Sequence, residues 1–118
     1  MKRSGRDIKI FAAIVLCISY CPPTQAQFFN GNHIQYWCSQ PAGSNLKEGV
    51  SAYLSGVMDG AVYSKNPDLE ICMPEGARIQ QARDVFCKYL SKHPESRHRT
   101  AAHLVLESIK TAWPCSRL

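Results

Sequence analysis

The sequence predicts an all-α fold: a small four-helix domain, with one short and three longer helices, cross-linked by two disulfides. Three observations predict it. Apolar residues recur every three or four positions through three segments, which is the periodicity of an amphipathic helix. An alternation of apolar and polar residues, which would predict strands, never lasts more than a few residues. Six cysteines are many for 118 residues, and four of them follow a segment that we expect to be removed.

Residues 1–26 have the pattern of a cleaved secretory signal peptide. Four basic residues within 1–9 precede an apolar run over 10–20, and Thr24 and Ala26 supply the small residues that cleavage after Ala26 requires. An uncleaved anchor is the alternative, and the shortness of the apolar run disfavours it. We therefore expect export to the periplasm, followed by a mature chain of residues 27–118 that forms a single helical domain.

The charge of the mature chain does not indicate a nucleic-acid partner. The formal net charge of the whole chain is +5, but the predicted leader removes four basic residues and one acidic residue. The remaining basic residues are scattered among acidic ones, whereas a nucleic-acid footprint needs a clustered patch. No second apolar segment is long enough to span a membrane. The chain is also too short for a barrel enzyme or a dinucleotide-binding fold.

Four cysteines remain in the mature chain, namely Cys38, Cys72, Cys87 and Cys115. An even number in a short exported chain predicts two disulfides, and the residues alone leave all three pairings open. A zinc site with the four histidines is the competing interpretation, but the sequence has no CxxC or HxxxH pair to favour it. A bridge that closes 45–50 residues contributes about 4 kcal/mol in the chain-entropy model.

The first two helices are expected within 27–40 and over 46–64. Asn30 or Asn32 can cap the first, and Asn45 with Glu48 has capping-box spacing before the second. The apolar stripe of the second is the strongest periodic signal in the chain and consists of Leu46, Val50, Tyr53, Leu54, Val57 and Ala61. Gly49, Gly56 and Gly60 follow one edge of this stripe, which indicates that another helix approaches closely there; a merely flexible helix is the alternative.

The third and fourth helices are expected over about 78–92 and 97–113, after a loop at 69–76 and a break at 92–96. The apolar face of the third consists of Ile79, Ala82, Phe86, Tyr89 and Leu90. The stripe of the fourth consists of Ala101, Leu104, Val105, Ser108, Ile109 and Ala112, and Pro114 ends that helix. We expect His98 to cap this helix or lie at the edge of the core, and His103 to point to solvent.

No pattern of catalytic residues appears in the sequence. The spacings of a Ser-His-Asp triad, a carboxylate pair and an HExxH motif are absent. A thiol enzyme needs a free cysteine, which an oxidising compartment disfavours. We therefore expect a binding protein with no catalytic residues, metal or cofactor.

An ordered set of short pieces carries a resemblance to a known family. The pieces are Asn30-Gly-Asn32 before Tyr36 and Cys38, then 53–59 (YLSGVMD), Cys72-Met-Pro74-Glu-Gly76 with Gln81, Tyr89-Leu90 with Pro94-Glu95 and His98, then Ala102, Leu104-Val105 and Ala112-Trp113-Pro114-Cys115. Through them residues 28–115 resemble the Tai/Rap-type immunity family. These are small periplasmic proteins that protect bacteria from peptidoglycan amidases delivered by type VI secretion.

Two departures from the family pattern bear on the structure. Val50 stands where the family usually has a cysteine, and Cys87 is an additional one. The resemblance therefore implies a Cys72–Cys115 disulfide, with Cys38–Cys87 as a re-routed second pair. Arg78 stands where the family usually has a threonine, so the third helix loses a side-chain cap worth about 1 kcal/mol.

The resemblance implies inhibition by occlusion of the toxin's active site. The partner would be an amidase toxin, no cofactor is needed, and a homodimer is expected because family members are commonly dimeric. Two loops are candidates for toxin contact: one consists of His93, Pro94, Glu95, Ser96, Arg97 and His98, and the other carries Met73 and Glu75. Tyr36 and Trp37 are further anchors if exposed, although for Trp37 we favour packing in the core. The alternatives are an orphan family member and a small periplasmic chaperone of the acid-stress type.

Overall fold

The computed structural model describes residues 28–116, so the predicted signal peptide lies outside the described residues. The helices are α2 (Gly31–Cys38), α3 (Asn45–Ser64), α4 (Ile79–Lys92) and α5 (Ala101–Ala112), with two short 3₁₀ helices, η1 (Pro67–Leu69) and η2 (Pro94–Ser96). Within the described range there is no strand, only an isolated antiparallel bridge between Asn30 and Thr100. The predicted all-α fold with four helices is confirmed.

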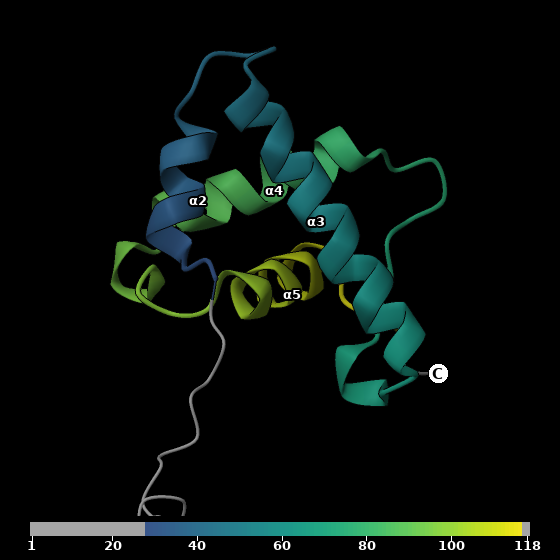
Figure 1. Cartoon of the computed structure of the whole chain (residues 1–118). Helices are drawn as coiled ribbons and strands as arrows, with labels where there is room; N and C mark the ends of the chain where they lie inside the picture. The colour runs from purple at the N-terminus through teal and green to yellow at the C-terminus, as the bar shows by residue number, and fades with distance from the viewer. Residues whose placement is uncertain (1–27, 117–118) are drawn as a thin grey trace, which may run out of the picture.

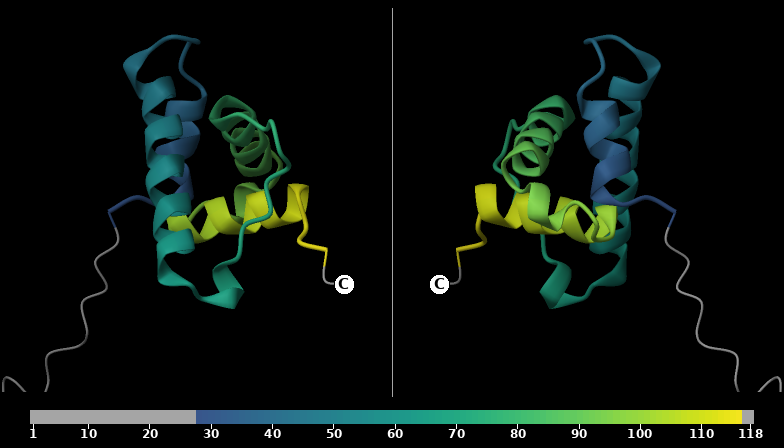
Figure 2. Two further views of the ribbon diagram at one scale, coloured as in Figure 1. Left: turned by 90° about the vertical axis from the view of Figure 1, so that its right-hand side faces the viewer. Right: turned by 90° about the vertical axis from the view of Figure 1, so that its left-hand side faces the viewer.

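The four α-helices enclose one apolar core. α2 and α3 run side by side, α4 packs against both, and α5 crosses them on one side (Figures 1 and 2). Every helix contributes fully buried side chains, the largest of which are Phe86, Ile34, Leu54, Leu90, Leu104, Ile109, Val50 and Val105. The core is therefore formed by the apolar stripes that the sequence predicts.

The stripes end where the helices extend beyond the core. Leu46, in the first turn of α3, is 38% exposed, and Ala112, in the last turn of α5, is also exposed.

Ser108 is buried among apolar neighbours, and its hydroxyl donates a hydrogen bond to the carbonyl of Val105 at 2.7 Å. A buried hydroxyl that is paired in this way does not carry the cost of an unmade hydrogen bond.

The start of α3 differs from the prediction, whereas the start of α2 does not. The Asn30 side chain accepts from the His33 N–H at 3.1 Å and caps α2 as expected. The expected capping box of Asn45 and Glu48 is wrong, because Asn45 is already helical and the Ser44 hydroxyl accepts from the Lys47 N–H at 3.2 Å. Serine is as good a cap as asparagine and lies one residue earlier.

The fourth helix begins four residues later than predicted. Residues 97–100 form a turn instead, because their backbone pairs with residues 30–32 at the beginning of α2. His98 is exposed in this turn, so its expected position as a cap or at the core edge is wrong, and Thr100 is the residue before the helix. His103 is exposed, as predicted.

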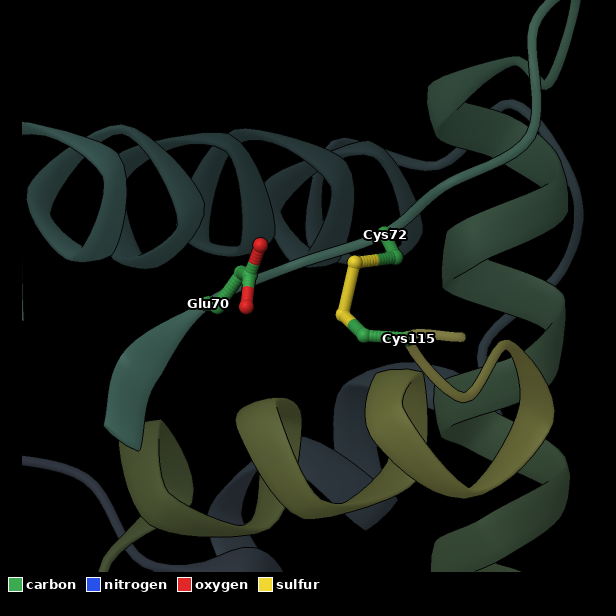
Figure 3. A group of neighbouring side chains, drawn as sticks. All are labelled: Glu70, Cys72 and Cys115. Atoms are coloured by element: carbon green, nitrogen blue, oxygen red, sulfur yellow. A yellow bond between two sulfur atoms is a disulfide. The ribbon is translucent and has the colours of Figure 1, made fainter. Parts of the chain in front are cut away.

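Two disulfides tie the helices together, in the pairing that the resemblance implied. Cys38 at the end of α2 is bonded to Cys87 in α4, with their Cα atoms 5.6 Å apart. Cys72, in the segment before α4, is bonded to Cys115 after α5, with Cα atoms 5.1 Å apart. The first bridge adjoins the core, and the second joins the segment that precedes α4 to the chain that follows α5 (Figure 3).

The close helix approach expected along the glycines of α3 is not found. A Cβ atom added at Gly56 or Gly60 would meet nothing within 4 Å, and one at Gly49 would only reach Trp37 at an ordinary 3.8 Å. The close approach occurs at Gly31 instead. A Cβ there would lie 2.7 Å from Leu104 Cδ1 and 2.8 Å from the Arg97 backbone.

Replacing Gly31 by alanine should therefore lower the free energy of unfolding by about 1–3 kcal/mol, because the backbone of residues 31 and 97 must move apart. Gly56→Ala is the matched control: it adds the same methyl group to open space on a helix, where alanine is favoured over glycine. Urea unfolding of both variants checks this. A Gly31→Ala protein as stable as the Gly56→Ala protein would contradict the close approach.

Candidate functional site

The first candidate loop lies between α4 and α5 and curls beneath the beginning of α2 (Figure 1). Pro94 opens the short η2 helix, and the Ser96 N–H donates to the His93 carbonyl at 3.1 Å. Pro94, Glu95 and His98 are exposed, whereas Ser96 and Arg97 are half-buried. The candidate residues of this loop therefore form one compact turn with three exposed side chains at the surface.

Arg97 holds this turn to the end of α4. Its Nε donates to the Leu90 carbonyl at 2.6 Å, and its Nη2 donates to the Ser91 carbonyl at 3.1 Å. Carbonyl groups in the last turn of a helix lack partners within the helix and carry a partial negative charge, which a guanidinium satisfies. Arg97 is therefore a bracing residue, although the sequence placed it among the candidates for partner contact.

The backbone at the beginning of α2 holds the same turn from the other side. The Asn32 N–H donates to the Arg97 carbonyl at 3.0 Å, and the Gly31 N–H to the Arg99 carbonyl at 3.1 Å. The Ala101 N–H in turn donates to the Phe29 carbonyl at 3.0 Å. Sequence reasoning missed this junction, and its only signal was a glycine at position 31.

A chain of side-chain contacts from α5 supports the exposed tip of the loop. Glu107 accepts from the Tyr89 hydroxyl at 2.9 Å and pairs with Arg99 at 3.0 Å. The Tyr89 ring lies against the His93 ring, with centroids 4.4 Å apart, and His93 Nδ1 lies 3.1 Å from Glu95 Oε1. The tip is thus connected through α4 to α5.

Two ionisable groups in this series of side-chain contacts have shifted pKa values. Burial, and then the hydrogen bond to Glu107, raise the pKa of the Tyr89 phenol, so the hydroxyl keeps its proton and remains a donor. The backbone N–H of Glu95 itself, and then the His93 ring, lower the pKa of the Glu95 carboxyl. The exposed tip of the loop therefore carries a carboxylate that stays ionised at neutral and mildly acidic pH.

The second candidate loop is anchored differently. Met73 is half-buried and packs against the core, so only Glu75 of the two proposed contact residues is exposed. Gly76 has φ of +82°, and the Ala77 N–H donates to the Pro74 carbonyl at 3.1 Å, which closes a turn. This loop offers one charged side chain next to the Cys72–Cys115 bridge.

Two aromatic residues singled out in the sequence have different environments. Tyr36 is exposed on α2. Trp37 packs against the core, with its ring centroid 5.0 Å from that of Phe29. Only Tyr36 is therefore available to a partner.

The end of α3 presents a third surface, which sequence reasoning did not find. Val62 is 70% exposed and Tyr63 is 87% exposed, where α3 projects past the core (Figure 1). Val62 also lines a groove of about 380 Å³, whose full lining is Ala61, Val62, Lys65, Asn66, Pro67, Leu69, Glu70 and Ile71. We call this surface the α3 end face. Exposed apolar side chains beside a groove are typical of a contact surface.

Glu70 lies beside the Cys72–Cys115 bridge, with the carboxylate and both sulfur atoms within 4.8 Å of one another (Figure 3). The two sulfur atoms are bonded to each other, and a metal-binding cysteine is a thiolate. While the disulfide is intact, Glu70 is therefore the one residue of this group that offers a charged ligand atom.

No helix among residues 28–116 is both long and apolar enough to cross a membrane.

The sequence profile of the family described as Rap1a immunity proteins matches residues 30–115, which includes all four helices and both disulfides. A search among curated proteins finds no match.

Replacing Arg97 by alanine should lower the free energy of unfolding by about 2 kcal/mol, because two charge-assisted hydrogen bonds to the end of α4 are lost. Arg78→Ala is the matched control, since the Arg78 side chain makes no capping bond at the start of α4, and it should change stability by less than about 0.5 kcal/mol. Urea unfolding gives both values, and hydrogen exchange at the Asn32 amide should rise only in Arg97→Ala. Equal stability of the two variants would contradict the bracing role.

Proposed function

Because the chain belongs to the Rap1a immunity protein family, we propose that it binds a peptidoglycan-amidase toxin delivered by type VI secretion and occludes the toxin's active site. An immunity protein has a toxin as its partner, and immunity proteins are generally non-enzymatic. The amidase, the secretion route and the occlusion are our proposal. Occlusion requires only a surface that fits the toxin and keeps its conformation.

The braced loop at residues 93–98 is the observation that carries this proposal. Its backbone is held by α2 on one side and its Arg97 side chain by α4 on the other. A loop that is already ordered loses little conformational entropy when it enters a cleft, so more of the contact energy remains as affinity. The loop also presents Pro94, Glu95 and His98 outward, which gives it shape and charge at its tip.

We propose that the protein acts in the periplasm. Two disulfides and the immunity family are features of a periplasmic or extracellular protein. The predicted signal peptide at residues 1–26 would deliver it there. An amidase that cleaves the cell wall would be met in the same compartment.

We further propose that two copies associate through the α3 end face. In a dimer with two-fold symmetry, the same patch lies on both sides, so a projecting side chain must fit a hollow in the same patch. Tyr63 is exposed next to Val62, which lines the groove, and the lining residues Lys65 and Glu70 carry opposite charges. The face therefore offers exposed apolar side chains for burial between two copies, and opposite charges that can pair across the two-fold axis.

A competition on a solid surface tests the immunity role. A strain that lacks this gene should lose to its parent in contact, and the full-length chain should restore survival. The chain without residues 1–26 should not restore survival, because it cannot reach the periplasm. Equal survival of the deleted strain would contradict immunity and would favour an orphan family member or a periplasmic chaperone.

Analytical ultracentrifugation tests the dimer. The purified mature chain should sediment at about twice the monomer mass, and Tyr63→Lys should sediment as a monomer, since a charge is then placed in the apolar contact. Tyr36→Lys is the matched control, because Tyr36 is an exposed tyrosine on a different helix, α2. A dimer that survives Tyr63→Lys, or a wild-type monomer at high concentration, would exclude this interface.

A further inference from the structure

We propose that Glu95 is the specificity-determining residue of the loop and that its carboxylate takes the place of a substrate carboxylate in the amidase's active site. The substrate class that it imitates is an acidic peptide, the stem peptide of peptidoglycan. This inference rests on the proposed function. It adds the residue that makes the contact and the chemistry by which the toxin recognises it.

Glu95 is exposed at a well-defined position on the loop. The side chain is 67% exposed, and it lies in the middle of the η2 turn, directly after Pro94. Proline fixes its own backbone angle, and the turn is braced on both sides by α2 and α4. A carboxylate on such a turn projects from the molecule at a defined place, as a contact that enters an active site must.

The orientation and the charge of the Glu95 carboxylate are set by its neighbours. His93 Nδ1 lies 3.1 Å from Oε1, and the His93 ring is in turn supported by Tyr89. These contacts restrict the side chain before any partner binds, which lowers the entropy cost of binding. The lowered pKa of the carboxyl keeps the group ionised through neutral and mildly acidic pH. The second carboxylate oxygen can still accept further hydrogen bonds.

The other nearby acidic residue cannot fill this role. Glu107 is half-buried and engaged by Tyr89 and Arg99. Glu95 is the only acidic residue between positions 85 and 106. Any carboxylate that this loop delivers to a partner is therefore that of Glu95.

The proposed substrate of the toxin carries the same chemical group as Glu95. Stem peptides of peptidoglycan carry free carboxylates close to the amide bonds that an amidase hydrolyses. An enzyme that binds them must offer cationic groups or hydrogen-bond donors to those carboxylates. A fixed carboxylate from a partner can engage the same donors and exclude the substrate. An enzyme without donors in that place would bind the loop less tightly, which makes this contact a source of specificity.

The test compares variants of the full-length chain in the gene-deleted strain, with the toxin delivered by the parent in contact. Glu95→Gln keeps the shape and removes the charge, and it should reduce protection to near that of the deleted strain. Glu95→Asp should restore part of it. Asp84→Asn is the matched control, since Asp84 is an exposed carboxylate on α4, and it should protect fully. Thermal unfolding of Glu95→Gln should match the wild type, because the side chain is exposed.

Measurements in solution give the size of the effect. With the purified amidase of the same strain, Glu95→Gln should bind about 10- to 100-fold more weakly, the range for loss of a charge-assisted hydrogen bond. A synthetic acidic stem peptide should compete with the wild-type chain for the amidase. His93→Gln keeps the carboxylate and should bind more tightly than Glu95→Gln.

The outcomes separate the two proposals. If the wild-type chain itself fails to protect, the proposed function is wrong. If the wild-type chain protects and Glu95→Gln protects equally, the inference about Glu95 is wrong while the function stands. Two other results would also overturn the inference: an equal loss of binding in His93→Gln and Glu95→Gln, which assigns the effect to the shape of the loop, or a loss in Glu75→Gln alone, which assigns the contact to the other loop.

Discussion

The absence of a side chain at position 31 is the constraint on which the arrangement of the molecule depends. Gly31 lets the beginning of α2 approach the Arg97 backbone so closely that a single methyl group would collide with it. Only at that distance can the backbone of residues 29–32 exchange hydrogen bonds with residues 97–101. The junction therefore fixes where α2 lies against α5, and it also orders the loop that we propose to meet the toxin. The packing of α2 and the proposed toxin contact therefore depend on the same junction.

The two disulfides complement this junction because they secure other parts of a small core. Cys38–Cys87 joins the far end of α2 to α4, so α2 is held at its beginning by backbone pairing and at its end by a covalent bond. Cys72–Cys115 holds the long segment between α3 and α4 against the chain that follows α5. That segment has little regular structure of its own apart from η1. It is held by this bridge, by a hydrogen bond from Lys110 to the Asp68 carbonyl, and by the packing of Ile71 and Met73 against the core.

The sequence predicts the helices well because the apolar residues that define each helix recur at short, regular intervals. Leu54, Phe86 and Ile109 belong to stripes that are read directly from spacing, and these residues are buried. The pairing of Cys38 with Cys87 came from the family resemblance, since spacing alone left three pairings open. The bracing by Arg97 could not be predicted, because it joins a loop residue to carbonyls of the preceding helix and leaves no periodic pattern. The close approach expected at the glycines of α3 is absent because a glycine in a sequence does not show what lies beside it.

The loop and the α3 end face occupy different ends of the molecule, which allows both proposed contacts to form at once. The loop lies beneath the beginning of α2, whereas Val62 and Tyr63 lie at the last turn of α3, past the core (Figure 1). A dimer formed through the α3 end face would leave both loops facing outward. Each copy would then present its own Glu95, so one dimer would bind two toxin molecules. Toxin binding would also involve no dissociation of the dimer, because the junction at Gly31 that orders the loop lies within a single chain.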